Sequence, residues 1–338
     1  MEPYTTPARI PVIHIGIPKT ATKTLQWRLF SCHSEIFYLG RFDGPKYGKN
    51  HKIFDYCRDV FVQDLIQRIA LDYPDTPNYE ECKKALTKII TPALKNNLLP
   101  VWSWESHYIA SLEIIQTRAK NLKMVFDKAK IIINIRNPID LVESLYFQKI
   151  KVYNVGSKQQ RTFLPYYKPI DNWLDDNYDE YILYHIQYAD IIQALAQQFG
   201  KENVHVFMFE ELTNNPRDYI RRTCNVMEIN PEEGINLCGD KIENRRWTQN
   251  QIDELIKITK SIPKKIIFSF SGGRKRRKLL GLDKYNMPIN YGKNAQANIS
   301  PEWQEKIFNQ TRQGHLWLQE NYKLPLDKYG YFGNKGKT

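Results

Sequence analysis

A short apolar segment that ends in glycine and runs directly into a helical pattern constrains the fold more than any other feature. Residues 11–15 read Pro-Val-Ile-His-Ile, a β-branched run typical of a strand, and Gly16 closes it. The next apolar residues are Leu25, Leu29 and Cys32, at the i, i+4 and i+7 spacing of one helix face. The sequence therefore predicts a strand, a loop and a helix.

The loop between that strand and helix carries the groups of an anion site. Its sequence over residues 16–24 is Gly-Ile-Pro-Lys-Thr-Ala-Thr-Lys-Thr. A strand that turns into a helix through glycine presents backbone N–H groups and the positive end of the helix dipole above the sheet. Lys19 adds a mobile cation. Hydroxyl donors come from Thr20, Thr22 and Thr24. A phosphate or sulfate group fits this loop chemically.

The phosphate loop of ATPases, GxxxxGK[ST], is the alternative template. In that pattern the lysine follows the second glycine, whereas Lys19 lies three residues after Gly16. Lys23 and Thr24 fit the final pair only if the spacer is lengthened and Ala21 is read for the glycine. The match to an ATPase is therefore poor, and a P-loop kinase is kept as an alternative function.

A second strand-to-helix junction supplies another anion-binding pair. Residues 130–135 are the clearest buried strand in the sequence, and Arg136 follows at its carboxyl end, where open α/β sheets bind ligands. The next helix begins at Pro138 with Asn137 as N-cap, and Ser144 lies about two turns into it. An arginine fork and a hydroxyl can converge on one phosphate.

Further strands and helices alternate along the chain. Strands are predicted for residues 99–104 and 204–209, and helices for 79–96, 112–124 and 180–199. Strands separated by helical stretches of ten or more residues need crossover connections and form a largely parallel sheet covered on both faces. The sequence thus predicts an α/β fold with a central, mainly parallel sheet.

The two phosphate elements together resemble the nucleotide-binding signatures of the sulfotransferase family, which uses 3′-phosphoadenosine-5′-phosphosulfate (PAPS). GIPKTATKTLQ resembles the family's PKxGTxxL loop, and RNPIDLVESLY resembles its second signature, from an arginine to a serine eight residues on. Weaker agreement spans residues 10–332. The resemblance implies a P-loop NTPase-like three-layer sandwich, with one domain over residues 1–338 and insertions at about 40–96 and 151–180.

The same resemblance implies roles for individual residues. The 5′-phosphosulfate end would be held by Lys19, Thr20, Ala21, Thr22, Lys23 and Thr24. The 3′-phosphate, which distinguishes this nucleotide from ATP, would be held by Arg136 and Ser144. Sulfuryl transfer needs cations where charge builds up, so Lys19 is the residue expected to stabilise the leaving phosphate oxygen. The product would be adenosine 3′,5′-bisphosphate.

The acceptor must lose a proton, so a carboxylate or imidazole is expected within hydrogen-bond reach of it. The predicted strand 99–104 ends in Glu105-Ser106-His107. In the family the base is a glutamate or a histidine, and a strand of this kind is one of its locations. Glu105 is therefore the first candidate for the catalytic base, and His107 is the second. The chemistry needs no metal, and the sequence has no cluster with ligand spacing, which predicts a metal-independent enzyme.

Two departures from the family pattern concern the loop and the acceptor. Ala21 replaces the usual glycine, which requires the loop to avoid positive φ at that residue. No Arg-Lys-Gly near the C-terminus matches the cytosolic small-molecule branch, so the resemblance favours a carbohydrate-directed or bacterial-type branch. We therefore expect transfer to a hydroxyl or amine of a carbohydrate or glycoconjugate.

Charge and cysteine content limit the partners and the compartment. The 49 Lys and Arg residues against 37 Asp and Glu give a net charge of +12, which favours anionic partners, but no nucleic-acid-binding motif accompanies it. A non-catalytic polyanion-binding protein is a further alternative. The basic run 274–278 is predicted to be a solvated loop. Five cysteines without a CxxC pair fit a reducing cytoplasm, and no run approaches membrane-spanning length.

Overall fold

The computed structural model of the chain describes residues 9–39, 79–105, 109–239, 247–283 and 292–333. These residues pack into two units. The first comprises the described parts of Met1–Arg136, Gln187–Lys241 and Gln313–Tyr329. The second comprises those of Asn137–Ile186, Ile242–Arg312 and Gly330–Thr338. That both units form one domain with two insertions stays a prediction.

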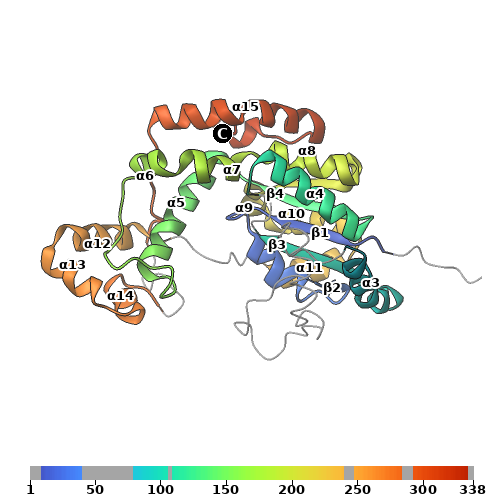
Figure 1. The fold of residues 1–338 in the computed structure, drawn as a ribbon, viewed down its shortest axis with the longest axis horizontal. Helices are drawn as coiled ribbons and strands as arrows, with labels where there is room; N and C mark the ends of the chain where they lie inside the picture. The colour runs from blue at the N-terminus through green and yellow to red at the C-terminus, as the bar shows by residue number, and fades with distance from the viewer. Residues whose placement is uncertain (1–8, 40–78, 106–108, 240–246, 284–291, 334–338) are drawn as a thin grey trace, which may run out of the picture. The chain divides into compact units, whose positions relative to one another are not determined.

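The first unit is built on a five-stranded sheet in which every pairing among the described strands is parallel (Figure 1). The strands are β1 (Val12–Gly16), β2 (Ile36–Tyr38), β3 (Leu99–Glu105), β4 (Lys130–Ile135) and β5 (Val204–Met208), in the spatial order β2-β3-β1-β4-β5. The four longer strands confirm the predicted segments. β2 has only three residues and gives no periodic signal. Because β1 is the central strand, the loop after it leaves from the middle of the sheet.

Helices cover both faces of this sheet (Figure 1). One face packs against α3 (Tyr79–Lys95), α4 (Leu112–Phe126) and α8 (Tyr188–Phe199), and the other against η1 (Leu25–Phe30), α9 (Phe209–Asn214), α10 (Pro216–Met227) and α11 (Pro231–Cys238). Successive strand residues point to opposite faces. The side chains of Val12 and Ile132 accordingly pack in the core with η1 and α10. Those of Ile13 and Ile131 are buried on the opposite face of the sheet. The predicted three-layer α/β sandwich is confirmed.

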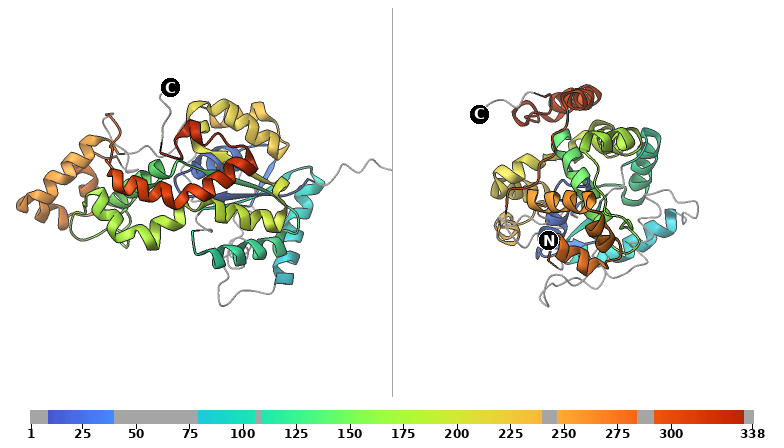
Figure 2. Two further views of the ribbon diagram at one scale, coloured as in Figure 1. Left: turned by 90° about the horizontal axis from the view of Figure 1, so that it is seen from above. Right: turned by 90° about the vertical axis from the view of Figure 1, so that its left-hand side faces the viewer.

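The described part of the second unit is helical. Its helices are α5 (Pro138–Val155), α6 (Ile170–Asn177), η3 (Tyr178–Ile182), α7 (Leu183–Ile186), α12 (Gln249–Lys260), α13 (Ile262–Ser269), α14 (Gly273–Leu279) and the opening turns of α15 (Pro301–Tyr322). Figure 2 shows α12, α13 and α14, in orange, grouped together. Asn137 caps α5 as predicted, because its side chain accepts hydrogen bonds from the backbone N–H groups of Ile139 and Asp140.

Two helix predictions are wrong. The single helix expected over residues 180–199 is interrupted at Gln187, whose ψ of 60° takes the backbone out of the helical region and separates α7 from α8. The basic run 274–278 is not a loop but the body of α14. Of the described helices, none combines the length and the apolar character needed to cross a bilayer.

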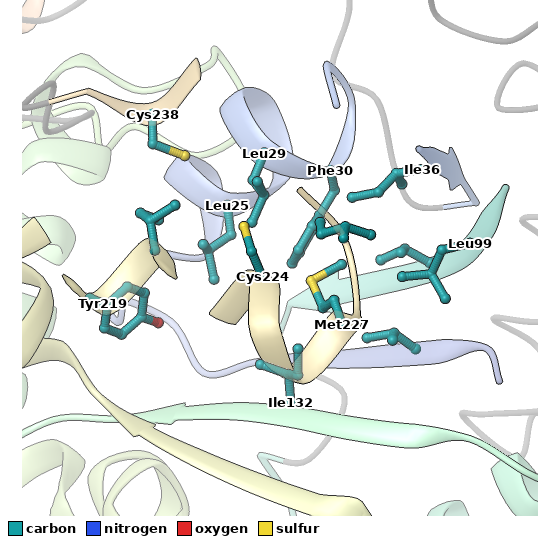
Figure 3. Packing of buried hydrophobic residues seen from close by; sticks show 14 of the residues in the cluster. Leu25, Leu29, Phe30, Ile36, Leu99, Ile132, Tyr219, Cys224, Met227 and Cys238 are labelled. Carbon is teal, nitrogen blue, oxygen red and sulfur yellow. The ribbon is translucent and has the colours of Figure 1, made fainter. Parts of the chain in front are cut away.

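A hydrophobic cluster fixes the helix that follows the central loop (Figure 3). Leu25, Leu29 and Phe30 of η1 pack there against Cys224 and Met227 of α10, and all five side chains are buried. Burying a leucine or phenylalanine side chain contributes about 1.5–3 kcal/mol. The loop is therefore held between a central strand and a helix anchored in the core.

The anchored helix is wider than an ordinary α-helix. It starts as α1 (Thr22–Thr24) and continues as the π-helix η1, where the backbone N–H of Ser31 donates to the carbonyl of Gln26, five residues earlier, at 3.1 Å. The predicted position of the helix is confirmed, and its π geometry is a local feature frequent near functional sites.

Candidate active site

Three of the predicted site elements meet at the carboxyl edge of the sheet. Gly16, the last residue of β1, pairs in register with Glu105, the last residue of β3. Arg136 directly follows the end of β4, the other neighbour of β1. Parallel strands that lie side by side end at the same edge, and ligands of open α/β sheets bind there. The loop, Glu105 and Arg136 are thus brought together.

Gly16 allows the loop to close tightly onto the strand end. A Cβ at this position would lie 2.6 Å from Thr22 Cγ2, 2.8 Å from Thr22 Oγ1 and 3.1 Å from the carbonyl oxygen of Trp104. The first two distances are shorter than any real Cβ contact. The missing side chain therefore lets the first helical turn start directly against β1.

The loop backbone alternates in the sign of φ. Lys19 has φ of 69° and Ala21 of 71°, while Thr20 between them stays outside the positive region. Such alternation is typical of a nest, a backbone form whose consecutive N–H groups point to one side and suit an anion. The expectation that Ala21 avoids positive φ is wrong: it adopts the left-handed conformation, at φ 71° and ψ 14°. Glycine enters this conformation without strain, and alanine does not.

Two of the three predicted hydroxyl donors stabilise the loop itself. Thr20 Oγ1 donates to the carbonyl oxygen of Ile17 at 2.6 Å, and Thr22 Oγ1 donates to the same oxygen at 3.3 Å. Both threonine side chains are buried. Since their hydroxyl hydrogens are used within the loop, the backbone N–H groups of Thr20 and Thr22 are the donors suited to an anion.

A buried asparagine on β4 holds the loop from the side. Asn134 Nδ2 donates to the carbonyl oxygen of Thr20 at 3.1 Å, and Asn134 Oδ1 accepts from the hydroxyl of Tyr219 at 2.8 Å. Burial raises the pKa of Tyr219 well above its ordinary value, so the phenol stays a neutral donor. Sequence reasoning missed both residues. The available signal was a lone asparagine in an otherwise aliphatic strand.

Arg136 connects the two signatures. Its Nη1 donates to the carbonyl oxygen of Lys19 at 3.1 Å, and its guanidinium carbon lies 4.4 Å from the centre of the Phe209 ring. Its own carbonyl oxygen accepts from the hydroxyl of Tyr188 at 2.6 Å. Side chain and backbone are therefore both fixed, and a positive charge stands beside the loop.

The remaining predicted residues are Lys23, Ser144 and His107. Lys23 Nζ lies 5.2 Å from the centre of the Trp27 ring, one turn further along the helix. Ser144 is buried in α5 and belongs to the second unit. His107, the second candidate base, lies outside the described residues.

A buried polar group two residues before Gly16 also escaped sequence reasoning. His14 Nδ1 lies 2.7 Å from Ser103 Oγ, which also accepts from Gln26 Nε2 at 3.0 Å. Burial lowers the pKa of His14 to about 3, so the ring is neutral at ordinary pH. These contacts join β1, β3 and η1 at the base of the loop.

A central strand, a loop with alternating signs of φ and an anchored helix define an α/β protein whose strand-loop-helix junction resembles a P-loop. The family model described as the sulfotransferase domain matches residues 11–287. The chain belongs to the sulfotransferase family and is a transferase that moves sulfuryl groups. The recognition made from the two signatures is confirmed.

Solved structures of other sulfotransferases resemble this chain. A sulfotransferase from Alicyclobacillus acidocaldarius is 16% identical with a TM-score of 0.43, covering 80% of this chain and 99% of that chain. Sulfotransferase STF9 from Mycobacterium avium is 12% identical with a TM-score of 0.37, covering 82% and 76%. The sulfotransferase domain from the curacin biosynthetic pathway is 13% identical with a TM-score of 0.33, covering 66% and 75%. A comparison with curated protein sequences finds no match.

Proposed function

We propose that this sulfotransferase takes its sulfuryl group from PAPS. The observation that carries the proposal is the hydrogen bond from Arg136 to the carbonyl of Lys19, which links a phosphate nest to a second cation. A nest of N–H groups suits the oxygens of a phosphosulfate, and an arginine fork suits a terminal phosphate. A donor nucleotide with anionic groups at both the 5′ and the 3′ position matches this pair of features, whereas ATP has an anionic group only at the 5′ position.

Individual residues then take separate roles in transfer. The donor supplies a sulfuryl group, whose bond to the phosphate oxygen breaks as a bond to the acceptor oxygen forms. Lys19 provides positive charge for the phosphate oxygen that leaves. The nest around Thr20, Ala21 and Thr22 orients the 5′ end, Lys23 and Thr24 complete this site, and Arg136 holds the 3′-phosphate. The same role for Ser144, which belongs to the second unit, stays a prediction from the sequence.

Glu105 is proposed as the base. It stands at the end of β3, opposite Gly16 in the sheet register, and so at the same edge as the loop. A carboxylate there takes the proton of the acceptor hydroxyl as its oxygen attacks. His107 is the second candidate for the same role.

For the acceptor we propose a carbohydrate hydroxyl. An aromatic group in the second unit supports this assignment: Lys149 Nζ lies 4.8 Å from the ring centre of Tyr153 and 5.3 Å from that of Tyr181. The rings of Tyr153 and Tyr166 meet edge to face at 4.8 Å. Tyrosines combine an apolar ring with a polar tip, and sugars combine C–H faces with hydroxyls in the same way.

We propose that the reaction takes place in a reducing cytoplasm and without a metal. Among the described residues, Cys224 and Cys238 are free thiols, which supports the compartment. Lys19 and Arg136 provide the positive charge that magnesium ions supply in kinases. Activity should therefore survive EDTA, whereas loss of activity that magnesium restores would favour the kinase alternative.

Calorimetry tests the donor directly. Adenosine 3′,5′-bisphosphate is expected to bind more tightly than ADP or ATP, and to do so in EDTA. Tighter binding of ATP would overturn the proposal. A screen with ³⁵S-labelled donor against sugars, phenols and amines tests the acceptor, and transfer to phenols alone would contradict the carbohydrate assignment.

A further inference from the structure

Helix α13 presents an apolar stripe to solvent. Ile262, Ile266 and Phe270, the last at its C-cap, follow at i, i+4 and i+8, which places them on one helix face. Their exposed fractions are 74%, 54% and 80%. Ile267 beside them is also exposed. Single exposed apolar side chains are ordinary on soluble proteins, but a whole helix face of them marks an interaction surface.

A second segment of the same unit extends this stripe. Phe163 and Leu164 lie in the turn-rich stretch after α5 and are 60% and 49% exposed. The ring of Phe163 meets that of Phe270 edge to face, with 5.4 Å between the ring centres. We name the six residues Phe163, Leu164, Ile262, Ile266, Ile267 and Phe270 the docking face.

A buried arginine holds the two segments of the docking face together. Arg276 of α14 is only 2% exposed. Its guanidinium donates to the backbone carbonyl oxygens of Asn154, Thr162, Phe163, Phe268, Ser269 and Ser271 at 2.7–3.4 Å. A charge is costly to bury unless it is fully hydrogen-bonded. These bonds compensate the cost and connect the backbone at Phe163 with the backbone of residues 268, 269 and 271, which flank Phe270.

The segments that carry the docking face are rich in cations and contain no acidic residue. Neither residues 255–282 nor residues 156–169 contain an aspartate or glutamate. The exposed cations of α13 and α14 are Lys264, Arg274, Lys275 and Lys278. An apolar helix face in a segment rich in lysine and arginine is typical of a surface that lies in the interface of an anionic membrane.

We propose that the docking face attaches this sulfotransferase to the surface of an anionic lipid bilayer. The isoleucines and phenylalanines enter the boundary between headgroups and acyl chains, and the lysines and arginines meet the lipid phosphates. A second copy of the chain would bring two cationic surfaces together, which electrostatics opposes. An anionic polymer would pair with the cations but would leave the isoleucines and phenylalanines in water.

Co-sedimentation of the full chain with vesicles, in the absence of nucleotide, tests the proposal. Binding is expected to vesicles of phosphatidylcholine with phosphatidylserine, and much less to phosphatidylcholine alone. Phe270→Ser should lower the partition coefficient about tenfold or more. Lys275→Glu should lower it at least about fivefold. Both side chains are exposed, so the fold should be retained.

Matched variants elsewhere provide the controls. Ile114→Ser on α4 removes an isoleucine that is 43% exposed, and Lys88→Glu on α3 changes the same charge as Lys275→Glu. Both should bind vesicles as the wild type does. The proposal is overturned if the wild type does not bind anionic vesicles, or if the controls lose as much binding as the docking-face variants.

Two further outcomes would assign the docking face to another partner. A dimer in sedimentation velocity that Phe270→Ser dissociates would assign it to a second copy of the chain. Heparin binding that Lys275→Glu abolishes and Phe270→Ser leaves intact, without vesicle binding, would assign it to an anionic polymer. Vesicle binding does not involve the sulfuryl donor, so these results stand apart from the test of the proposed function.

Discussion

Arg136 and Lys19 are 117 positions apart in the chain and are joined by a hydrogen bond of 3.1 Å from the guanidinium to the backbone carbonyl. The cation of the second signature therefore also supports the backbone of the first. Two segments that look independent in the sequence are therefore connected, and under the proposed PAPS binding a change at Arg136 should affect both ends of the nucleotide.

Replacing Arg136 by alanine should weaken the binding of adenosine 3′,5′-bisphosphate by roughly 2–3 kcal/mol, since a charge-assisted pair with phosphate is lost. The affinity for AMP, which lacks the 3′-phosphate, should fall less, and only because the loop is weakened. Calorimetry with both ligands measures the difference. Arg222→Ala, which removes an arginine over the Phe207 ring of the same unit, should change neither affinity. Equal losses for both ligands would contradict the 3′-phosphate assignment.

Gly16→Ala should destabilise the protein by about 1–3 kcal/mol, because the new Cβ would overlap the Thr22 side chain and force the loop outward. Its affinity for adenosine 3′,5′-bisphosphate should fall as well. Denaturant unfolding measures the stability. Adding Thr22→Ala removes both overlapping atoms and should restore part of the stability, although the carbonyl of Trp104 remains close. Additive losses in the double variant would argue against this close contact.

Ala21→Gly should raise the free energy of unfolding by about 1 kcal/mol, because glycine enters the left-handed conformation without the strain that alanine carries. Thermal or urea unfolding provides the measurement. Ala85→Gly within α3 is the control with opposite sign: it should destabilise by about 0.5–1 kcal/mol, as glycine does inside a helix. A loss of stability in Ala21→Gly would show that the alanine is not strained.

The positions of the strands and of the loop could be predicted because each is a local pattern. β1 and β4 are β-branched runs, one ending at Gly16 and the other directly before Arg136, and a parallel sheet brings such ends to one edge. The conformation of Ala21 could not be predicted. Alanine by itself avoids positive φ, and the hydrogen bonds from Asn134 and Arg136 that fix its neighbours come from a distant part of the chain.

Buried polar residues and charged helices were missed for related reasons. His14 and Asn134 interrupt apolar strands, and their partners Ser103 and Tyr219 are far away in sequence. The run around Arg276 looks solvated by composition, yet its arginine turns inward to backbone carbonyls that only the folded chain brings together. Sequence patterns report the exposure of a typical side chain, whereas these residues depend on individual partners.

Glu105→Gln should lower kcat by about 10²–10⁴-fold, because the amide cannot accept the acceptor's proton. The affinity for adenosine 3′,5′-bisphosphate should stay unchanged, since the base acts on the acceptor. Initial rates with labelled donor and calorimetry separate the two effects. Glu113→Gln, at the start of α4, is the matched control and should leave both unchanged. A wild-type rate in Glu105→Gln would move the role to His107, which His107→Asn then tests.

The neutral, buried His14 should make stability depend on pH. Its pKa is about 3 in the folded protein and about 6.5 when unfolded, so between these values the unfolded chain binds the extra proton. The stability that neutral His14 contributes is fully present above pH 6.5. As the pH falls from 6.5 toward 3, the free energy of unfolding decreases by about 1.4 kcal/mol per pH unit. His14→Asn keeps an amide for Ser103 but does not titrate.

Urea unfolding of His14→Asn between about pH 6 and pH 4 should therefore show a slope smaller by about 1.4 kcal/mol per pH unit than that of the wild type. The variant starts from a lower stability at neutral pH because asparagine leaves a small void. His185→Asn should reduce the slope by the same amount, but only between about pH 6.5 and pH 4, because burial lowers the pKa of His185 to about 4. Parallel curves for wild type and His14→Asn would mean that His14 takes up its proton without unfolding.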